Sequence, residues 1–513
     1  MDHFIGIDIG TSSVKSLIMA EDGRIVGTAQ VKYDVMRPLP GYAEQDIDVL
    51  WEAARDTLRQ LARRYPDEIR SVTGIGYSGQ MHGLVLVDRD GRPLRKAIIW
   101  EDQRSVREID EIYAAVPRDE FCRVTMNTLS TGFLISSLLW VRNNEPELFE
   151  RAASLIMIKD YIRMKMVGGL ACDTSDASSA IIFDVAKRTW AWDLIDRLSL
   201  PRAVFPECRE AYEIAGTVRD DVADELGLPR GVTAVYGGGD TLMHEVGTAM
   251  ISEEAPWIIN IGTSCQVSCA VKTPRCDPLF RTNTFCHVHE DLWMLMSANL
   301  CGGAAMKWLS EMIFEGYTYE ELNECAESVP AGSEGLLFLP YLNGGRSPDN
   351  DPKARAMYLG LTLSHGRRHM IRATMEGVIF SLKSSYSLLR EITGKEPEYM
   401  IASGGGARGG VFLQMQADAF NKPIHTTVEA EQSCIGAAIT AAVGMGRYDS
   451  YESACRELIR FKPDVVVPIP ENVETYDRLF EVYKRLYPQN RELFERLSSL
   501  RCRREPARGA CLP

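Results

Sequence analysis

Two similar stretches of sequence decide the expected fold: Phe-Ile-Gly-Ile-Asp-Ile-Gly-Thr-Ser at residues 4–12 and Trp-Ile-Ile-Asn-Ile-Gly-Thr-Ser at residues 257–264. Each is an apolar run that ends in a Gly-Thr-Ser turn, and a second strand-like run follows each turn, at residues 14–19 and 267–271. Short runs of this kind joined by a glycine turn indicate a β-hairpin. The recurrence half a chain apart predicts two lobes of common design that each offer one turn to a shared cleft. Two unrelated hairpins would give the same pattern.

The length and periodicity of the chain agree with two lobes. A chain of 513 residues exceeds what one hydrophobic core usually organises. Residues 48–64 have helical periodicity, and strand-like runs such as residues 72–77 and 232–236 alternate with helices, so the predicted class is α/β. The predicted parts are an N-terminal lobe at residues 1–248, a C-terminal lobe at residues 249–486, and a helix end with a frayed basic tail at residues 487–513.

Composition restricts the binding partners and the compartment. A net charge of -14 disfavours binding to nucleic acid or to an anionic membrane surface. The 13 cysteines are scattered without paired spacing, which is typical of a reducing compartment, and no export signal or long apolar run is found, so we expect a cytoplasmic protein. An acidic protein binds phosphate locally, through backbone N–H groups and a metal ion, which directs attention to glycine turns.

The first glycine turn carries a candidate metal ligand. Asp8 ends an apolar run, and Gly10, Thr11 and Ser12 follow it. A carboxylate beside turn N–H groups and hydroxyls can hold Mg²⁺ against nucleotide phosphates that the turn cradles. An aspartate in an ordinary β-turn has the same local sequence.

Two further glycine turns lie in the second half of the chain. Gly262 and Thr263 supply donors equivalent to those of the first turn, so that the two turns can clamp a diphosphate from opposite sides. Another turn separates a strand-like run at residues 399–403 from a helical pattern, and such a turn admits close approach of a ribose, an adenine or an α-phosphate. It lacks the Lys-Ser/Thr ending of a P-loop. Its residues are Gly404, Gly405, Gly406 and Ala407.

A run of three glycines precedes the candidate catalytic base. Residues 237–239 are glycines that follow a strand-like run, and Asp240 comes next. The glycines let the backbone turn sharply and place one carboxylate at the carboxyl end of the sheet, where ligands of α/β proteins bind. An alcohol that attacks phosphorus needs a base within hydrogen-bond reach, and aspartate commonly serves in alcohol-directed phosphoryl transfer. A flexible loop with a solvated aspartate is the alternative.

Two polar loops are candidates for substrate binding. Met81 and His82 lie on a glycine-flanked turn, where the imidazole can bond a sugar hydroxyl and the thioether can cover a C–H face; a structural loop histidine is the alternative. Trp100 and Asp102 lie on the second loop, where Arg104 can orient Asp102 through a bidentate pair.

Taken together, these motifs resemble those of the FGGY carbohydrate kinases, and among them the xylulokinases, over residues 5 to about 486. The stretch 356–376 fits the second signature of that family at every constrained position, and residues 77–83 are similar to the xylulokinase substrate loop. The resemblance implies two actin-like, ribonuclease H-like lobes with a central cleft that closes on sugar, ATP and Mg²⁺. Homodimers are frequent in this family.

The resemblance also implies roles for individual residues. Asp240 would be the catalytic base, Asp8 would hold Mg²⁺, and Met81 and His82 would contact the ketose. The glycine turns would bind the phosphates and the rest of the nucleotide. The implied reaction is transfer of the γ-phosphate to the terminal hydroxyl at carbon five of D-xylulose.

Several departures from the family pattern loosen the assignment of the sugar. Ser137 stands where the first signature usually has lysine, and Glu101 stands where xylulokinases often have asparagine. The loop at residues 344–348 reads Gly-Gly-Arg-Ser-Pro and lacks the usual acid. A kinase for ribulose, gluconate or a glycerol-type polyol is therefore the alternative, and an actin- or Hsp70-like switch ATPase is a more remote one.

Overall fold

The computed structural model describes residues 2–502 and divides them into two compact units. The first unit comprises the chain up to Ala255 with the segments Ala270–Leu295 and Glu431–Arg460, and the second comprises Pro256–Cys269, Met296–Ala430 and the chain from Phe461. The predicted division had one break after residue 248, whereas two later segments also belong to the first unit. The assignment of sugar binding to one lobe and of nucleotide binding to the other stays a prediction, as does the central cleft. The predicted tail lies outside the described residues from residue 503.

The sheet of the first unit has seven strands, in the order β13-β14-β5-β1-β2-β3 with β15 also paired to β5. Strands β1, β2 and β3 are antiparallel neighbours, whereas β5 runs parallel to β1, β14 and β15. This is the arrangement of a ribonuclease H-like sheet. The strands are β1 (His3–Ile9), β2 (Ser13–Ala20), β3 (Ile25–Lys32), β5 (Val72–Gly79), β13 (Ile214–Thr217), β14 (Thr233–Val235) and β15 (Gly238–Gly239).

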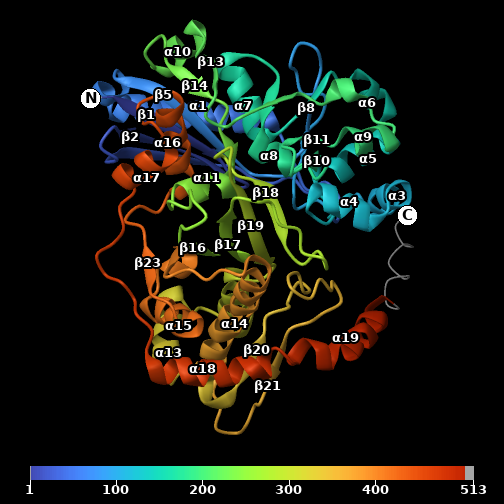
Figure 1. Ribbon diagram of the computed structural model, residues 1–513, viewed down its shortest axis with the longest axis vertical. Helices are drawn as coiled ribbons and strands as arrows, with labels where there is room; N and C mark the ends of the chain where they lie inside the picture. Colours follow the sequence, from blue (N-terminus) through green and yellow to red (C-terminus); the bar gives the residue numbers. More distant parts are fainter. Residues whose placement is uncertain (1, 503–513) are drawn as a thin grey trace, which may run out of the picture. The chain divides into compact units, whose positions relative to one another are not determined.

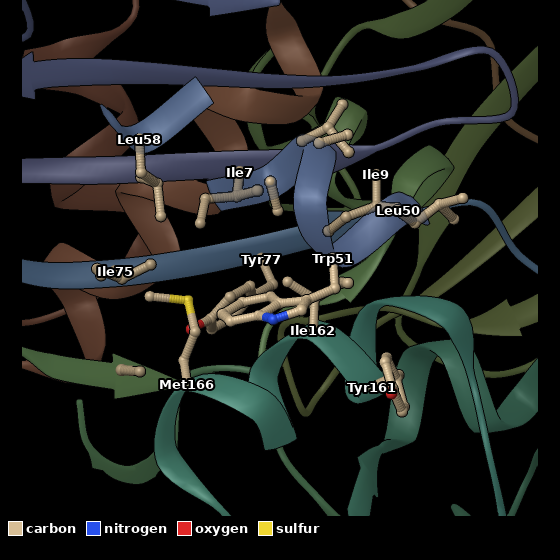
Figure 2. Packing of buried hydrophobic residues seen from close by; sticks show 14 of the residues in the cluster. Ile7, Ile9, Leu50, Trp51, Leu58, Ile75, Tyr77, Tyr161, Ile162 and Met166 are labelled. Atoms are coloured by element: carbon tan, nitrogen blue, oxygen red, sulfur yellow. The ribbon is translucent and has the colours of Figure 1, made fainter. Parts of the chain in front are cut away.

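Helices α1 (Ile47–Arg64) and α7 (Ile158–Val167) bury the core on one face of this sheet. Alternate residues of β1, namely Ile5, Ile7 and Ile9, are fully buried in that core, because side chains of a strand point to opposite faces in turn. Figure 2 shows Ile7 and Ile75 of the sheet with Leu50, Trp51 and Leu58 of α1 and Ile162 and Met166 of α7. The helix predicted at residues 48–64 is thereby confirmed as α1.

The other face of the sheet contacts helix α16 (Gln432–Gly444), which Figure 1 shows beside β1 and β5. Glycines make this approach very close. A Cβ atom added at Gly6 of β1 would lie 1.8 Å from the carbonyl oxygen of Cys434, and one added at Gly76 of β5 would lie 1.9 Å from that of Ala437. Helix α11 (Asp240–Val246) in turn packs against α16. The segment Glu431–Arg460 therefore completes the first unit although it lies late in the sequence.

Shorter elements complete the first unit. Strands β9 and β12 form a parallel pair, and β6 pairs with β8 in antiparallel fashion. The elements are β6 (Val85–Val87), β8 (Ser154–Ile156), β9 (Ala171–Asp173), β12 (Glu207–Arg209), α3 (Val106–Ala115), α4 (Arg118–Thr125), α5 (Leu134–Asn144), α6 (Pro146–Arg151), α8 (Thr174–Ser178), α9 (Trp192–Arg197), α10 (Asp220–Leu226) and α17 (Tyr451–Leu458).

The second sheet has the order β18-β19-β17-β16-β22-β23. Strands β16 and β17 form an antiparallel hairpin, and β22 runs parallel to both β16 and β23, so the sheet repeats the pattern of the first and confirms the predicted hairpin repeat. Within residues 2–502, none of the helices is both long and apolar enough to cross a lipid bilayer. The elements are β16 (Trp257–Ile261), β17 (Cys265–Val271), β18 (Asn283–Cys286), β19 (Trp293–Asn299), β22 (Met400–Gly404), β23 (Ile424–Thr426), α12 (Gly303–Trp308), α13 (Tyr319–Glu327), α14 (Arg367–Thr393), α15 (Gly410–Phe420), α18 (Pro470–Tyr483) and α19 (Leu486–Cys502).

Candidate active site

Three parallel strands of the first unit end side by side and bring two acids together. In the register of the sheet, Asp8 of β1 and Gly238 of β15 both lie opposite Ser78 of β5. Asp240 follows one residue after the end of β15 as the first residue of α11. The structure therefore places the predicted metal ligand and the predicted base on either side of one strand end.

The carboxyl group of Asp240 has a pKa near neutral pH. Burial, and then the nearby charge of Asp8, raise the pKa of Asp240 to about 7, against the opposing effect of hydrogen bonds from Thr241. The backbone N–H of Thr241 donates to Oδ1 at 2.7 Å, and its hydroxyl donates to the same oxygen at 3.2 Å. A base with a pKa near the working pH combines a high ionised fraction with useful proton affinity. A carboxyl group whose pKa is raised by burial and by a second nearby acid is typical of a functional site.

Asp8 is held by its neighbours on β5 and β2. Burial raises the pKa of Asp8, whereas the hydroxyl of Ser78, which donates to Oδ1 at 2.7 Å, and the charge of Lys15 favour its ionised form. Lys15 lies opposite Asp8 in the β1–β2 register, and its Nζ forms an ion pair with Glu431 at 2.6 Å. Sequence reasoning missed Ser78, Lys15 and Glu431, because only strand pairing and the late segment before α16 bring them to Asp8.

The turn after β1 is fixed by side chains from three other segments. Trp100 Nε1 donates to the hydroxyl of Thr11 at 3.0 Å, and Gln45 Nε2 donates to the carbonyl oxygen of Thr11 at 2.6 Å. Gln80 Nε2 donates to the carbonyl oxygen of Gly10 at 3.2 Å. The structure thus brings the predicted Trp100 to the predicted phosphate turn. Sequence reasoning gave no role to Gln45, and none to Gln80 although it lies within the predicted substrate loop at residues 77–83.

Met81 and His82 lie next to the glycine run that carries Asp240. A Cβ atom added at Gly239 would lie 2.8 Å from Met81 Cγ, so the thioether side chain packs directly on that glycine. His82 has a positive φ of 70° and stacks on Phe133 with ring centroids 4.0 Å apart. Its Nδ1 donates to the carbonyl oxygen of Ser179 at 2.7 Å, and in the neutral ring Nε2 is then an acceptor. This tautomer suits a histidine that accepts a hydrogen bond from a sugar hydroxyl.

The carboxylate of Asp102 forms its hydrogen bonds with other residues of the protein. It is 1% exposed, and Oδ2 accepts hydrogen bonds from the backbone N–H of Ala43 at 2.6 Å and from Arg104 Nη2 at 2.8 Å. Arg104 Nε donates to Oδ1 at 2.9 Å, which confirms the predicted bidentate pair. Arg104 also stacks over Tyr42, with 3.8 Å from Cζ to the ring centroid. The contacts favour a role of Asp102 in holding the loop of Trp100; its predicted contact with the sugar stays a prediction.

The second unit gathers its glycine turns at one edge of its own sheet. Ile261 of β16 lies opposite Gly404 of β22, so the turns that follow these two parallel strands are neighbours. Gly262 and Thr263 are exposed, and the carbonyl oxygen of Gly262 accepts a hydrogen bond from the N–H of Gly303 at 2.7 Å. Gly404 has a φ of 71°, and an added Cβ would lie 2.6 Å from the carbonyl oxygen of Ile261. Only glycine fits there without strain.

Two ribonuclease H-like sheets, paired acids at adjoining strand ends and glycine turns define the protein as a phosphoryl-transfer enzyme of the sugar kinase type. The N-terminal domain model of the FGGY family of carbohydrate kinases matches residues 3–247, and the C-terminal domain model matches residues 258–445. The chain therefore belongs to the FGGY family of carbohydrate kinases. As a kinase of this family it takes ATP and a sugar as its substrates and transfers phosphate to an alcohol group.

Individual relatives cover nearly the whole chain. A xylulose kinase of Lactococcus lactis is 32% identical over 498 residues, which are 97% of this chain and 99% of that protein. The crystal structure of xylulose kinase from Rhodospirillum rubrum superposes with a TM-score of 0.89 at 28% identity, covering 96% of this chain and 100% of that chain. Gluconate kinase from Lactobacillus acidophilus superposes with a TM-score of 0.90 at 26% identity, covering 97% and 99% of the two chains.

Proposed function

We propose that the protein phosphorylates a ketopentose, D-xylulose, at the terminal hydroxyl of carbon five, with ATP as phosphate donor and Mg²⁺ as metal. The observation that carries the proposal is the pair Asp8 and Asp240 at adjacent strand ends, with Met81 packed on the glycine that precedes Asp240. The similarity to xylulose kinases over nearly the whole chain supports D-xylulose as the sugar.

Asp240 is assigned as the general base. Its carboxylate accepts the proton of the attacking hydroxyl as the new O–P bond forms, and Thr241 keeps the ionised form available by donating two hydrogen bonds to Oδ1. His82 and Met81 are assigned to the sugar: Nε2 of His82 accepts a hydrogen bond from a hydroxyl, and the thioether of Met81 covers the C–H face. These contacts orient the hydroxyl toward phosphorus.

Asp8 offers a hard carboxylate oxygen, and Mg²⁺ is commonly bound by one or two carboxylates together with substrate phosphates and water. The donor set therefore fits Mg²⁺, which would neutralise charge on the phosphates when bound. Among residues 2–502, no group of three or more His, Cys, Asp or Glu side chains could hold a metal by itself. Gly10, Thr11 and Ser12 are assigned to the phosphates, as are Gly262 and Thr263. Gly404, Gly405, Gly406 and Ala407 are assigned to the rest of the nucleotide.

A panel of acceptors tests the assignment. ADP release is measured by a coupled assay with D-xylulose, D-ribulose, D-gluconate or glycerol, and without acceptor. We expect the highest kcat/KM with D-xylulose and little ADP release without sugar, and phosphorus NMR of the product should show a phosphate ester at carbon five. Highest activity with gluconate would replace the ketopentose by a sugar acid. Equal ATP hydrolysis with and without sugar would favour a switch ATPase.

We further propose a cytoplasmic location, which free thiols such as those of Cys122, Cys265 and Cys434 support. A homodimer is proposed from family membership alone, and light scattering coupled to size-exclusion chromatography tests it.

A further inference from the structure

The first unit contains a buried lysine that no motif singled out. Lys159 of α7 is fully buried, and its Nζ lies 2.6 Å from Oδ1 of Asp160 and 2.7 Å from Oδ1 of Asp173. Oδ2 of Asp176 lies 3.8 Å away, and all three carboxylates are also fully buried. Burial lowers the pKa of Lys159, but the three carboxylates outweigh burial and hold its pKa above the ordinary value. The lysine therefore joins α7 to the segment around α8, and a second buried cation, Arg163 of α7, lies with its Nε 3.9 Å from Oδ1 of Asp160.

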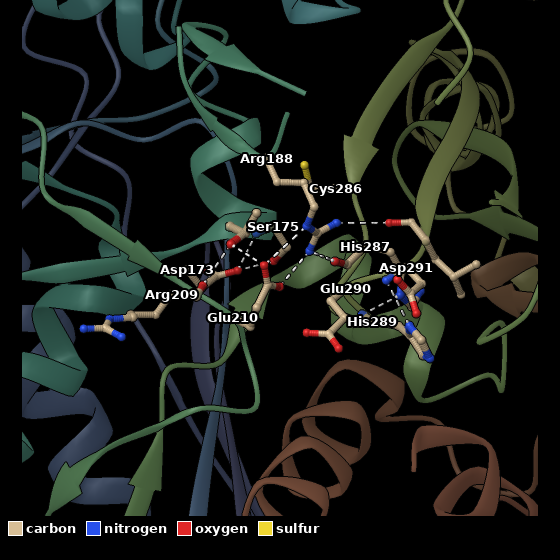
Figure 3. Close-up of polar contacts among 12 residues, drawn as sticks. Asp173, Ser175, Arg188, Arg209, Glu210, Cys286, His287, His289, Glu290 and Asp291 are labelled. Atoms are coloured by element: carbon tan, nitrogen blue, oxygen red, sulfur yellow. Dashed lines mark hydrogen bonds and ion pairs between the residues drawn. The ribbon is translucent and has the colours of Figure 1, made fainter. Parts of the chain in front are cut away.

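One chain of contacts begins with the ion pair of Lys159 and Asp173 and continues through hydrogen bonds to the turn that carries Asp240. Oδ2 of Asp173 accepts hydrogen bonds from the N–H of Ser175 at 2.7 Å and from its hydroxyl at 2.5 Å, and Figure 3 shows Asp173 and Ser175 together. The hydroxyl oxygen of Ser175 accepts a hydrogen bond from the backbone N–H of Gly239 at 3.2 Å. Gly239 directly precedes Asp240. The lysine is thus connected through Asp173 and Ser175 to the backbone that aims the base.

A second chain of contacts begins with the ion pair of Lys159 and Asp176 at 3.8 Å and continues through hydrogen bonds to the sugar loop. Oδ1 of Asp176 accepts a hydrogen bond from the hydroxyl of Ser179 at 3.0 Å. The Ser179 hydroxyl oxygen accepts from the backbone N–H of His82 at 3.1 Å, and the Ser179 carbonyl oxygen accepts from Nδ1 of His82 at 2.7 Å. The two contacts fix both the backbone and the ring tautomer of His82, whose positive φ needs such support.

We propose that Lys159 is a positioning residue of the phosphoryl transfer: through Asp173 and Asp176 it holds the segment 173–179, which sets the Asp240 turn with Ser175 and His82 with Ser179. This inference rests on the function proposed above. Lys159 also packs on the end of β5 itself, since a Cβ atom added at Gly79 would lie 2.7 Å from Lys159 Cβ. Buried ion clusters often add little stability, so a role in fixing geometry accounts for the retention of four charged groups in the interior.

Two serine variants test the two chains of contacts separately. In Ser175→Ala the N–H of Gly239 loses its acceptor, and we expect kcat to fall roughly 10- to 100-fold with little change in the KM for D-xylulose, because small misplacement of a catalytic group is costly. In Ser179→Ala both the backbone and the side-chain support of His82 weaken, and we expect the KM for D-xylulose to rise about 5- to 10-fold with kcat largely kept. A merely structural role would lower the melting temperature without this division between kcat and KM.

Ser178→Ala is the matched control. Ser178 lies on the same helix and is equally buried, and its hydroxyl donates to the carbonyl oxygen of Ser175 at 2.6 Å and accepts from the N–H of Cys286 at 3.1 Å. It has no contact with Lys159, His82 or Gly239 among these hydrogen bonds, so we expect lower stability with both kinetic constants within about twofold of wild type. If Ser175→Ala and Ser179→Ala behave like Ser178→Ala, the positioning role is wrong.

Lys159→Met tests the lysine directly. We expect kcat to fall and the KM for D-xylulose to rise together, and we expect the double variant Lys159→Met/Ser175→Ala to have nearly the kcat of the worse single variant, because residues in one network are not additive. Full additivity would contradict the proposal. If Lys159→Met does not fold, the serine variants decide alone. Wild-type protein without sugar-dependent ADP release would instead refute the proposed function, and if another sugar is preferred the variants are measured with that sugar.

Discussion

The hairpin β1–β2 of the first unit and the hairpin β16–β17 of the second share a backbone frame but differ in charge. Asp8 lies two residues before Gly10 and opposite Ser78 of the parallel strand β5. Asn260 lies two residues before Gly262 and opposite Ser403 of the parallel strand β22. The repeat therefore extends to the neighbouring strand, and a carboxylate in one unit corresponds to an amide in the other. We infer that one copy supplies charge for a metal and the other supplies neutral donors.

The two sheets also differ in how closely a helix backbone can pack against their strands. Gly6 and Gly76 of the first sheet allow the backbone of α16 to touch the strands. The corresponding positions in the second sheet, counted back from the turns, are Ile258 and Ile401, which are buried side chains. Close packing of α16 brings Glu431, at its N-terminus, to Lys15 and hence to the surroundings of Asp8. The specialised electrostatics of the first unit thus depend on glycines far from the chemistry.

The largest expected effect comes from removing the proposed base of the first unit, Asp240. Asp240→Asn keeps the shape of the side chain but cannot accept the proton, so we expect kcat to fall roughly 10²- to 10⁴-fold. Isothermal titration with an ATP analogue should give nearly unchanged nucleotide affinity, because the variant leaves the glycine turns intact. Turnover close to that of wild type would show that another group is the base.

The next effect tests the exchange of carboxylate and amide between the two hairpins. Asp8→Asn makes the first unit resemble the second, and we expect a loss of about 100-fold in kcat/KM for ATP together with a higher Mg²⁺ requirement. The mirror change Asn260→Asp adds a negative charge near the proposed phosphate site, and we expect only about a fivefold rise in the KM for ATP. Equal effects of the two changes on kcat would mean that the units are not specialised in this way.

The hairpins, the parallel strands and the family could be predicted from sequence because each depends on local signals: apolar runs, glycine turns and helical periodicity. The same signals gave Asp8, near the end of an apolar run, Asp240, directly after three glycines, and Met81 and His82, on a glycine-flanked turn. Whether these residues perform their assigned chemistry is left to the experiments above.

Other parts of the site could not be predicted, because they depend on pairing between distant segments. Ser78 acquires its role from the register of β1 and β5, and Gln45 reaches Thr11 from a separate loop. Lys159 shows no signal at all, since a lysine on a helix normally indicates a solvated face, whereas here three carboxylates from two segments balance its burial.

A smaller effect is expected from a matched pair of glycine variants in the second unit. At Gly404 an added Cβ would lie 2.6 Å from a backbone oxygen at a positive φ of 71°, whereas at Gly262 the nearest atom would be 3.9 Å away. We expect Gly404→Ala to raise the KM for ATP about tenfold, because the turn must shift, and Gly262→Ala to change it less than about twofold. A stronger effect of Gly262→Ala than of Gly404→Ala would contradict this ranking, because it would mean that a Cβ atom in the turn after β16 hinders the nucleotide more than the shift of the turn after β22.

The smallest expected effect concerns stability and tests the electrostatics of the first unit alone. Burial and Asp8 raise the pKa of Asp240 from 3.8 to about 7 on folding. Between these two values the folded protein binds more protons than the unfolded chain, so this carboxyl group lowers stability progressively as the pH rises from 4 to 7. Asparagine cannot ionise, and we expect Asp240→Asn to melt ~2 °C above wild type at pH 8, with EDTA and without nucleotide, and the difference to shrink toward pH 4.

Asp224 is the control in the same unit, since its hydrogen bond from Arg230 lowers its pKa and makes its ionised form stabilising. Asp224→Asn should therefore melt no higher than wild type at pH 8, and a gain in that variant equal to the gain in Asp240→Asn would show that the effect comes from net charge rather than from the buried pair of acids.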